Sequence, residues 1–403
     1  MRKIFILVCF VLSIFNTKAQ QLIISDSAEI SLITCSPGEE AYEKFGHTAI
    51  RIKDSKNQID ITFNYGIFSF ETNDFYLKFI KGETDYQLGV YETSNFLPEY
   101  QSRNSMVWEQ ILNLNPIEKR KIINLLLENY APENRIYRYN FVFDNCATRP
   151  RDKILESLNG YIKFQTNSNP KTFRQWIGVY VGTDTWLKFG IDVIFGLEAD
   201  RVASQSESMF LPEILMDEFE AAQIETTSGT LKKLVSEKRT LVNKIDSKPA
   251  SNSSQISKPT TFSILLLIIG ALLTIWDAKR RRPSKWVDTT ILTITGIGGL
   301  IVFYLMLFSS HPLVKINFNI LWLNPLNLAL GGLIWIKSVK LRRILFFYQI
   351  FNIALLIGAL TAFAISAQVF NSASFPLIVL LLMRASSWSG YTKRKLFKKH
   401  RDI

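Results

Sequence analysis

Hydrophobic residues follow different patterns in the two halves of the chain. In the N-terminal half, short apolar stretches alternate with polar positions or recur at helical spacing, whereas the C-terminal half carries long apolar runs. Strands and helices are mixed without an internal repeat in the first half, which predicts an α+β fold there. The strand-like stretches are 30–35, 47–53, 59–65 and 84–91, and the helical ones are 115–130, 147–158 and 209–222.

The apolar runs of the C-terminal half predict an all-α bundle of about five transmembrane helices. Several of these runs approach the ~20 residues that a helix needs to cross a bilayer. The third and fifth runs are the weakest, because Asn324-Pro325 interrupts one and Arg384 lies inside the other. The five runs lie near 262–276, 289–308, 319–336, 344–366 and 374–390.

Charge divides the chain in the same way. The net charge is +12, but from Thr260 onward there are 17 Lys and Arg against 3 Asp and Glu, which leaves residues 1–259 at −2. Basic clusters follow the first, third and fifth runs. The intervening loops, 309–318 and 367–373, contain a single basic residue, Lys315. The positive-inside rule then places residues 20–259 outside the cytoplasm. The basicity therefore indicates membrane topology, and no nucleic-acid partner is expected.

The first nineteen residues are typical of a secretory signal peptide. Arg2 and Lys3 precede an apolar segment, and Ala19 ends a stretch suited to cleavage. An uncleaved N-terminal anchor is the alternative, and both readings export the residues that follow. We expect a multi-pass protein of the bacterial inner (cytoplasmic) membrane, with its N-terminal domain on the periplasmic side.

Domain boundaries follow from these segments. Residues 20–228 are expected to form the exported domain, 262–390 the transmembrane domain and 391–403 a basic cytoplasmic tail. Between the two domains, 229–261 is expected to contain an amphipathic helix, followed by a linker rich in Ser, Pro and Asn over 247–261. The helix is predicted from the near-helical spacing of Leu231, Leu234, Val235, Leu241, Val242 and Ile245.

Few residues in the exported domain are suited to nucleophilic chemistry. Once Cys9 leaves with the signal peptide, Cys35 and Cys146 remain, and in an oxidising compartment they could form a disulfide. His47 is the single histidine of this domain, and a lone histidine is often structural. With one histidine and two well-separated cysteines, no metal site is expected, and no cofactor motif is present.

The sequence around His47 predicts a β-hairpin. His47 and Arg51 lie on one face of the first strand, and Asp60 and Asn64 lie on the polar face of the second. If Arg51 is opposite Asp60, as cross-strand charge pairing favours, the same register places His47 opposite Asn64. An amide beside an imidazole can fix its tautomer, which makes Asn64 a candidate third member of a catalytic set.

Cys146 is expected at the start of a helix. An apolar run ends in Asp144-Asn145, and a helical pattern follows directly after the cysteine. The dipole and free N–H groups at a helix N-terminus favour the thiolate and can also hold an oxyanion. Arg149 and Arg151 would add positive potential. Cys35 has no comparable setting.

Several motifs together resemble the Lnb family of bacterial lipoprotein N-acyltransferases. They are T-C-S-P-G-E-E-A-Y-E-K-F-G-H-T-A-I-R, F-N-Y-G-I-F, N-F-V-F-D-N-C-A-T-R-P-R-D and, in the membrane half, H-P-L-V-K-I-N-F-N-I-L-W-L-N-P-L. More broadly, a strand histidine that precedes a D-N-C helix start is similar to the permuted papain-like arrangement of the NlpC and lecithin:retinol acyltransferase group. The resemblance implies a permuted papain-like fold for the exported domain.

The resemblance also implies an activity. It implies cysteine-dependent, ping-pong acyl transfer from a phospholipid acyl donor to the α-amine of a diacylated lipoprotein acceptor at the inner membrane, with no cofactor. Cys146 would be the nucleophile and His47 the base. Supporting or substrate-contacting roles are expected for Asp60, Asn145, Arg51, Glu40 and His311, although surface charges or a structural histidine would explain the last three equally well. A group of apolar residues could form a lipid-facing surface or belong to the ordinary hydrophobic core. They are Trp176, Val179, Trp186, Phe189, Ile194 and Phe195.

Two other classes of function fit part of the sequence. An NlpC-like cell-wall amidase or peptidase would use the same cysteine and histidine, but would not need five membrane spans. A non-catalytic membrane scaffold would retain the fold and join Cys35 to Cys146 in a disulfide.

Overall fold

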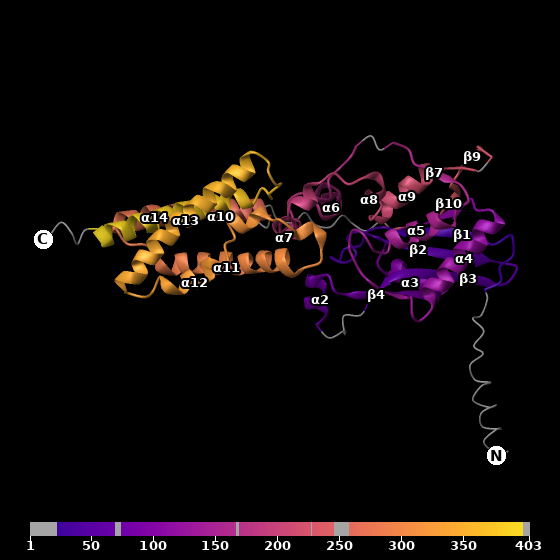
Figure 1. Ribbon diagram of the computed structural model, residues 1–403, viewed down its shortest axis with the longest axis horizontal. Helices are drawn as coiled ribbons and strands as arrows, with labels where there is room; N and C mark the ends of the chain where they lie inside the picture. Colours follow the sequence, from indigo (N-terminus) through magenta and orange to yellow (C-terminus); the bar gives the residue numbers. More distant parts are fainter. Residues whose placement is uncertain (1–21, 69–73, 167–168, 227, 246–257, 398–403) are drawn as a thin grey trace, which may run out of the picture.

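The computed structural model describes residues 22–68, 74–166, 169–226, 228–245 and 258–397. The predicted signal peptide and most of the predicted linker lie outside these residues. Figure 1 shows two parts along the longest axis, a sheet-rich N-terminal domain and a helical C-terminal domain. The strands are β1 (Glu29–Cys35), β2 (His47–Asp54), β3 (Ile59–Ile67), β4 (Asp85–Glu92), β5 (Val107–Leu112), β6 (Ile136–Arg138), β7 (Tyr161–Lys163), β8 (Gln223–Glu225), β9 (Leu231–Lys233) and β10 (Val235–Val242).

A seven-stranded antiparallel sheet forms the centre of the N-terminal domain, in the order β10-β5-β1-β2-β3-β4-β6. Alternate residues of β1 and β2 point to opposite faces, so each face has its own core. The larger core, which includes Ile50 and Phe63, packs against α4, α5 and α9, whereas Cys35 and Ala49 pack against α3 on the other face. The helices of this domain are α2 (Phe75–Lys81), α3 (Thr93–Ser102), α4 (Pro116–Tyr130), α5 (Thr148–Ser157), α6 (Phe173–Val181), α7 (Trp186–Ile194), η1 (Leu197–Asp200), α8 (Gln205–Ser208) and α9 (Pro212–Ala221).

The strands and helices predicted for residues 30–222 are confirmed, but the predicted amphipathic helix before the membrane is wrong. That segment forms β9 and β10, and β10 pairs with β5 along the edge of the sheet. Leu234, Val235 and Val242 are buried there, while most side chains between them face solvent. Apolar residues at both ends of an edge strand have a spacing that resembles a helical period, which explains the error. The N-terminal domain therefore extends to Val242.

The predicted hairpin forms, but its register differs by two residues. Arg51 is paired with Thr62 and Ala49 with Asn64, instead of Arg51 with Asp60. A shift of two residues leaves every side chain on its original face, so diagonal neighbours still meet. Arg51 is 2.6 Å from Asp60 in a salt bridge, although the two residues are not directly opposite.

Within the described residues, the C-terminal domain has three helices that are long and apolar enough to cross a membrane: α10 (Pro259–Arg280), α11 (Lys285–Phe308) and α13 (Val339–Ala364). The third predicted run is not one helix, because it divides into η4 (Phe318–Leu321) and α12 (Leu326–Leu333) at Asn324-Pro325. The fifth run is α14 (Ser374–Phe397), which extends into the predicted basic tail. The remaining element is η3 (Pro312–Val314).

Arg384 explains why α14 is less apolar than the other long helices. Its guanidinium is buried between α10 and α11, 2.9 Å from Asp277 and 2.8 Å from Asp288. Its Nη1 also donates to the Thr274 hydroxyl at 3.1 Å. A buried cation persists when it is paired and hydrogen-bonded, so these contacts connect three helices of the bundle.

The loop after α11 docks on α2 of the N-terminal domain. The Ser310 amide donates to the Lys81 carbonyl at 2.7 Å, and the Ser309 hydroxyl donates to the Ile80 carbonyl at 2.8 Å. His311 Nε2 donates to the Phe79 carbonyl at 2.9 Å. These bonds satisfy the Ile80 and Lys81 carbonyls at the C-terminal end of α2 and add a second donor to the Phe79 carbonyl, which also accepts from the Gly82 amide.

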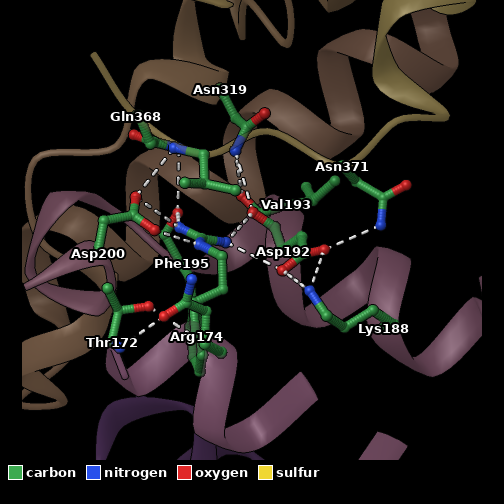
Figure 2. A network of polar contacts seen from close by, with 12 residues as sticks. Thr172, Arg174, Lys188, Asp192, Val193, Phe195, Asp200, Asn319, Gln368 and Asn371 are labelled. Atoms are coloured by element: carbon green, nitrogen blue, oxygen red, sulfur yellow. Dashed lines mark hydrogen bonds and ion pairs between the residues drawn. The ribbon is translucent and has the colours of Figure 1, made fainter. Parts of the chain in front are cut away.

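A second contact, centred on a buried arginine, joins the two domains (Figure 2). Arg174 of α6 lies 3.1 Å from Asp192 and 2.6 Å from Asp200 in two salt bridges. The membrane domain completes the network at two loops: Asn371 donates to the Asp192 carboxylate at 2.9 Å, and Asn319 to its carbonyl at 3.2 Å. The N-terminal domain is therefore fixed to the membrane domain at two separate places.

Candidate active site

His47 begins β2, where its ring is held by an amide of β3. Its Nε2 lies 2.6 Å from Oδ1 of Asn64. A carboxamide oxygen can only accept a hydrogen bond, so Nε2 carries the proton and Nδ1 of the neutral ring is left as an acceptor. The ring of Tyr100 stacks on the imidazole with centroids 6.2 Å apart. Asn64 therefore orients His47 and fixes its tautomer, as expected from the sequence.

Cys146 occupies a turn that Asn145 holds in place. The buried Asn145 side chain accepts hydrogen bonds from the amides of Ala147 at 2.8 Å and Thr148 at 2.9 Å. Its Nδ2 donates to the carbonyls of Phe141 and Phe210. Cys146 is two residues before α5, as predicted, and its side chain is partly exposed. Asn145 thus positions the cysteine without facing the reaction space itself.

Gly66 leaves the space in which the cysteine and the histidine meet. A Cβ at this position would lie 3.4 Å from Cys146 Cβ and 3.8 Å from His47 Cε1. The φ of Gly66 is +90°, a conformation that favours glycine, at a register shift between β3 and β4. An isolated glycine within a strand pattern often marks a close approach of chains, and the N-Y-G-I-F motif carried this signal.

The thiol and the imidazole interact electrostatically. Burial lowers the pKa of His47, but attraction by the Cys146 sulfur and hydrogen bonds with Cys146 and Asn64 outweigh this effect and raise it above the ordinary value. The arrangement is suited to transfer of the thiol proton to His47.

Tyr137 of β6 adds a donor that the sequence did not indicate. Its ring is 6% exposed, and its hydroxyl has no hydrogen-bond partner among the described residues. The same hydroxyl lies 4.0 Å from the Cβ position of Gly66, beside Cys146. Burial, and next the charge of Cys146, raise the pKa of Tyr137 well above its ordinary value, so the phenol stays protonated. The Arg149 guanidinium covers the ring at 3.6 Å.

The N–H groups at the start of α5 were expected to hold an oxyanion, but not all of them are available for this. The Ala147 amide is already bound to Asn145, so it does not point freely at the thiol. Arg149 pairs with Asp144 at 2.5 Å, and Arg151 pairs with Asp152 at 2.7 Å. These two arginines are therefore neutralised locally, whereas the Tyr137 hydroxyl beside Gly66 has no hydrogen-bond partner among the described residues.

Cys35 lies beside the site as a free thiol. It is opposite His47 in the register of β1 and β2, and it is fully buried. Both cysteines are free, so the disulfide expected for a scaffold is not formed. Burial raises the pKa of Cys35 well above its ordinary value, which keeps this thiol protonated and unreactive.

The other predicted site residues lie away from the thiol. Arg51 is buried and binds Asp60 and Glu109, so both Arg51 and Asp60 have structural partners. Glu40 is exposed in the loop before β2, and His311 binds α2 instead of Cys146 or His47. Of the six predicted lipid-facing residues, Trp176 and Phe195 are buried core, whereas Val179 and Trp186 are exposed.

Replacing Cys146 with alanine should lower the pKa of His47. The substitution removes both the attraction and the hydrogen bond of the sulfur, while burial, which lowers the pKa, remains. NMR titration of histidine-labelled protein would measure the pKa, with the resonance assigned from its loss in His47→Gln. An unchanged pKa in Cys146→Ala would show that the thiol and imidazole do not interact.

Comparison with known proteins adds two family matches. Residues 16–178 match the model of the Lnb N-terminal periplasmic domain, and residues 251–396 match that of the Lnb transmembrane domain. No curated protein and no solved structure matches the chain. His47, Asn64 and Cys146 all fall within the first match, and the loops that dock on the N-terminal domain fall within the second.

Proposed function

Since the chain belongs to the Lnb family and combines a periplasmic domain with a transmembrane domain, we propose that it is a lipoprotein N-acyltransferase with a permuted papain-like catalytic domain. Membership indicates a membrane enzyme of lipoprotein maturation, and the specific reaction is our proposal. It would move an acyl chain from a phospholipid to the α-amine of a diacylglyceryl-cysteine lipoprotein. The observation that carries it is the meeting of Cys146 with the Asn64-oriented His47 at Gly66.

The first half-reaction would load the enzyme. His47 Nδ1 takes the Cys146 proton, and the thiolate attacks the ester carbonyl carbon of a phospholipid. The carbonyl oxygen becomes an oxyanion, to which the Tyr137 hydroxyl donates a hydrogen bond. When the intermediate collapses, the carbon–oxygen ester bond breaks and His47 returns its proton to the leaving alkoxide. The products are a lysophospholipid and an acyl thioester on Cys146.

The second half-reaction would transfer the acyl chain. The neutral α-amine of the lipoprotein attacks the thioester carbonyl carbon, and the same oxyanion forms beside Tyr137. His47 takes a proton from the attacking nitrogen as the carbon–sulfur bond breaks. That proton returns to the Cys146 thiolate, and the product is an amide-linked acyl chain. No redox partner is required.

The same proposal includes five membrane-spanning segments with the N-terminal domain outside. Besides the three long helices, α14 would span with Arg384 neutralised by Asp277 and Asp288, and the segment from η4 to α12 would enter the bilayer as an interrupted span. Irregular backbone is tolerated at membrane depth when protein buries it. The buried amides of Asn319 and Asn327 satisfy polar groups along this interruption.

Trapping the acyl-enzyme tests the proposed function. Purified full-length protein in phospholipid nanodiscs, without an acceptor, should gain one acyl mass on the peptide that contains Cys146, and hydroxylamine should remove it. Addition of a diacylated lipopeptide should discharge the thioester and yield a triacylated peptide. A stable, correctly inserted protein that never acquires the acyl group would contradict the proposal, and cleavage of muropeptides by that protein would favour the cell-wall amidase instead.

A further inference from the structure

A cleft beside α2 is separate from the reaction space at Gly66. It has a volume of about 370 Å³ and opens between α2, the start of β4 and the end of β6. Its lining combines aromatic, cationic, acidic and hydroxyl side chains, and none of them was a predicted site residue. The lining residues are Phe68, Phe75, Lys78, Glu83, Thr84, Asp85 and Arg138.

The polar side of the cleft has groups that could bind an anion, next to an acidic side chain, Glu83. Thr84 is only 4% exposed, and its hydroxyl has no hydrogen-bond partner among the residues that the structure describes. A buried hydroxyl without a partner is costly, so it marks a position where a ligand acceptor would be favourable. Arg138 is paired with Asp85 at 2.7 Å, whereas Lys78 forms no salt bridge within the described chain. Lys78 and Thr84 thus offer a cation and a hydroxyl donor.

The apolar side of the cleft continues toward Cys146 through stacked aromatic rings. Phe75 stacks on Phe68 at 5.5 Å, and Phe68 stacks on Tyr86 at 4.9 Å. Tyr86 in turn stacks on Tyr139 at 4.1 Å. Cys146 packs against the same hydrophobic cluster, and its charge raises the pKa of Tyr139 after the larger effect of burial. A continuous row of aromatic side chains therefore extends from the cleft toward the thiol.

The cleft lies where the N-terminal domain meets the end of a membrane-spanning helix. The carbonyls at the end of α2 bind Ser309, Ser310 and His311, directly after α11. Figure 1 places α2 beside the membrane domain. Three apolar side chains of α2 are exposed next to its two lysines, which is typical of a helix that rests in a lipid interface. They are Leu77, Phe79 and Ile80, at 48%, 43% and 42% exposure.

We infer that this cleft is the docking site of a membrane phospholipid, with the phosphate held by Lys78 and Thr84 and an acyl chain laid along Phe75, Phe68, Tyr86 and Tyr139 toward Cys146. The inference rests on the proposed function for the identity of the lipid as acyl donor. It adds the place at which that lipid leaves the bilayer. Phosphate recognition by a cation and a hydroxyl, with apolar contact for the chain, matches the two chemical ends of a phospholipid.

Photo-cross-linking of a bound lipid tests this site. Full-length Cys146→Ala protein is placed in nanodiscs of phosphatidylethanolamine and phosphatidylglycerol, doped with phosphatidylethanolamine that carries a diazirine on its acyl chain. After irradiation, mass spectrometry should find the label on peptides that contain Phe68, Phe75 or Tyr86. Excess inorganic phosphate should not displace it, since the acyl chain supplies much of the binding. Displacement by phosphate would instead indicate a site for a free anion.

Two substitutions separate binding from folding. Thr84→Val removes a hydroxyl that has no protein partner, so the melting temperature should not fall, while labelling should fall about fivefold, as expected for one lost hydrogen bond. Lys78→Glu should reduce labelling further, and Lys81→Glu, on the same helix but outside the cleft, should not. The inference would be overturned if Thr84→Val and Lys78→Glu were labelled as strongly as the parent Cys146→Ala protein. It would also be overturned if the label were confined to the membrane helices.

The result does not depend on turnover, because Cys146 is absent from the labelled protein. Labelling of the cleft without thioester formation in the wild-type enzyme would support this site and contradict the proposed acyl transfer. If the thioester forms but labelling does not change in the Thr84 and Lys78 variants, the proposed acyl transfer would be supported and this lipid site would be contradicted.

Discussion

Substituting Cys146 with alanine should abolish lipoprotein N-acylation in cells that lack their own enzyme for it. The sulfur is the proposed nucleophile of both half-reactions, and loss of a catalytic nucleophile typically lowers kcat by at least about 10⁴-fold. Cys146 is a small, partly exposed residue in a turn that Asn145 holds, so the variant should fold and accumulate like the wild type. Mass spectrometry of lipoprotein N-termini would measure the third acyl chain.

Cys35→Ala is the matched control. This second thiol is buried and protonated, and it lies next to the site without belonging to the proposed chemistry. We expect it to support N-acylation at near wild-type level when its abundance is equal. A third acyl chain that persists in Cys146→Ala would rule out a thioester on Cys146. Loss of that chain only in Cys35→Ala would show that Cys35, and not Cys146, is the nucleophile.

Substituting Tyr137 with phenylalanine should slow acylation by about 10²–10³-fold, the usual effect of losing one oxyanion donor. The change removes a single oxygen, which has no hydrogen-bond partner in the described protein. Removing a buried hydroxyl that is unpaired does not weaken folding. We therefore expect slower formation of the thioester at an unchanged or higher melting temperature, measured by rapid quenching and mass spectrometry.

Tyr65→Phe is the comparison, because it should change stability and leave the rate of acylation unchanged. The Tyr65 hydroxyl donates to Asn129 at 2.8 Å, so its loss should lower stability by about 1 kcal/mol while the rate of acylation is retained. If Tyr137→Phe and Tyr65→Phe behave alike in both measurements, the unpaired Tyr137 hydroxyl has no role in the reaction.

The hairpin illustrates how far the sequence could predict the site. Alternation placed His47, Arg51, Asp60 and Asn64 on one face, and all four do lie there in two contacting pairs. It could not fix the register, because a shift of two residues preserves the faces and keeps diagonal side chains within reach. The pairing of His47 with Asn64 was therefore predictable, whereas the residue directly opposite was not.

Features that depend on distant parts of the chain were not predictable. Tyr137 has no local motif, and its importance arises from an absent partner, which only three-dimensional packing can reveal. The edge strand β10 was mistaken for a helix because its stabilising partner, β5, is about 130 residues earlier in the chain. The contacts between domains likewise join residues such as Asp192 and Asn371, which carry no signal of each other in the sequence.

The two interdomain contacts have a consequence for the choice of acceptor. Hydrogen bonds at α2 and the network around Arg174 hold the N-terminal domain on the membrane domain at two separate places, which opposes the outward swing of a domain held by a single tether. In the proposed reaction, the thiol would then work at one fixed height above the lipid headgroups. Only amines that are themselves anchored at that height can reach it, which would exclude the free N-termini of soluble periplasmic proteins without any recognition of their sequence.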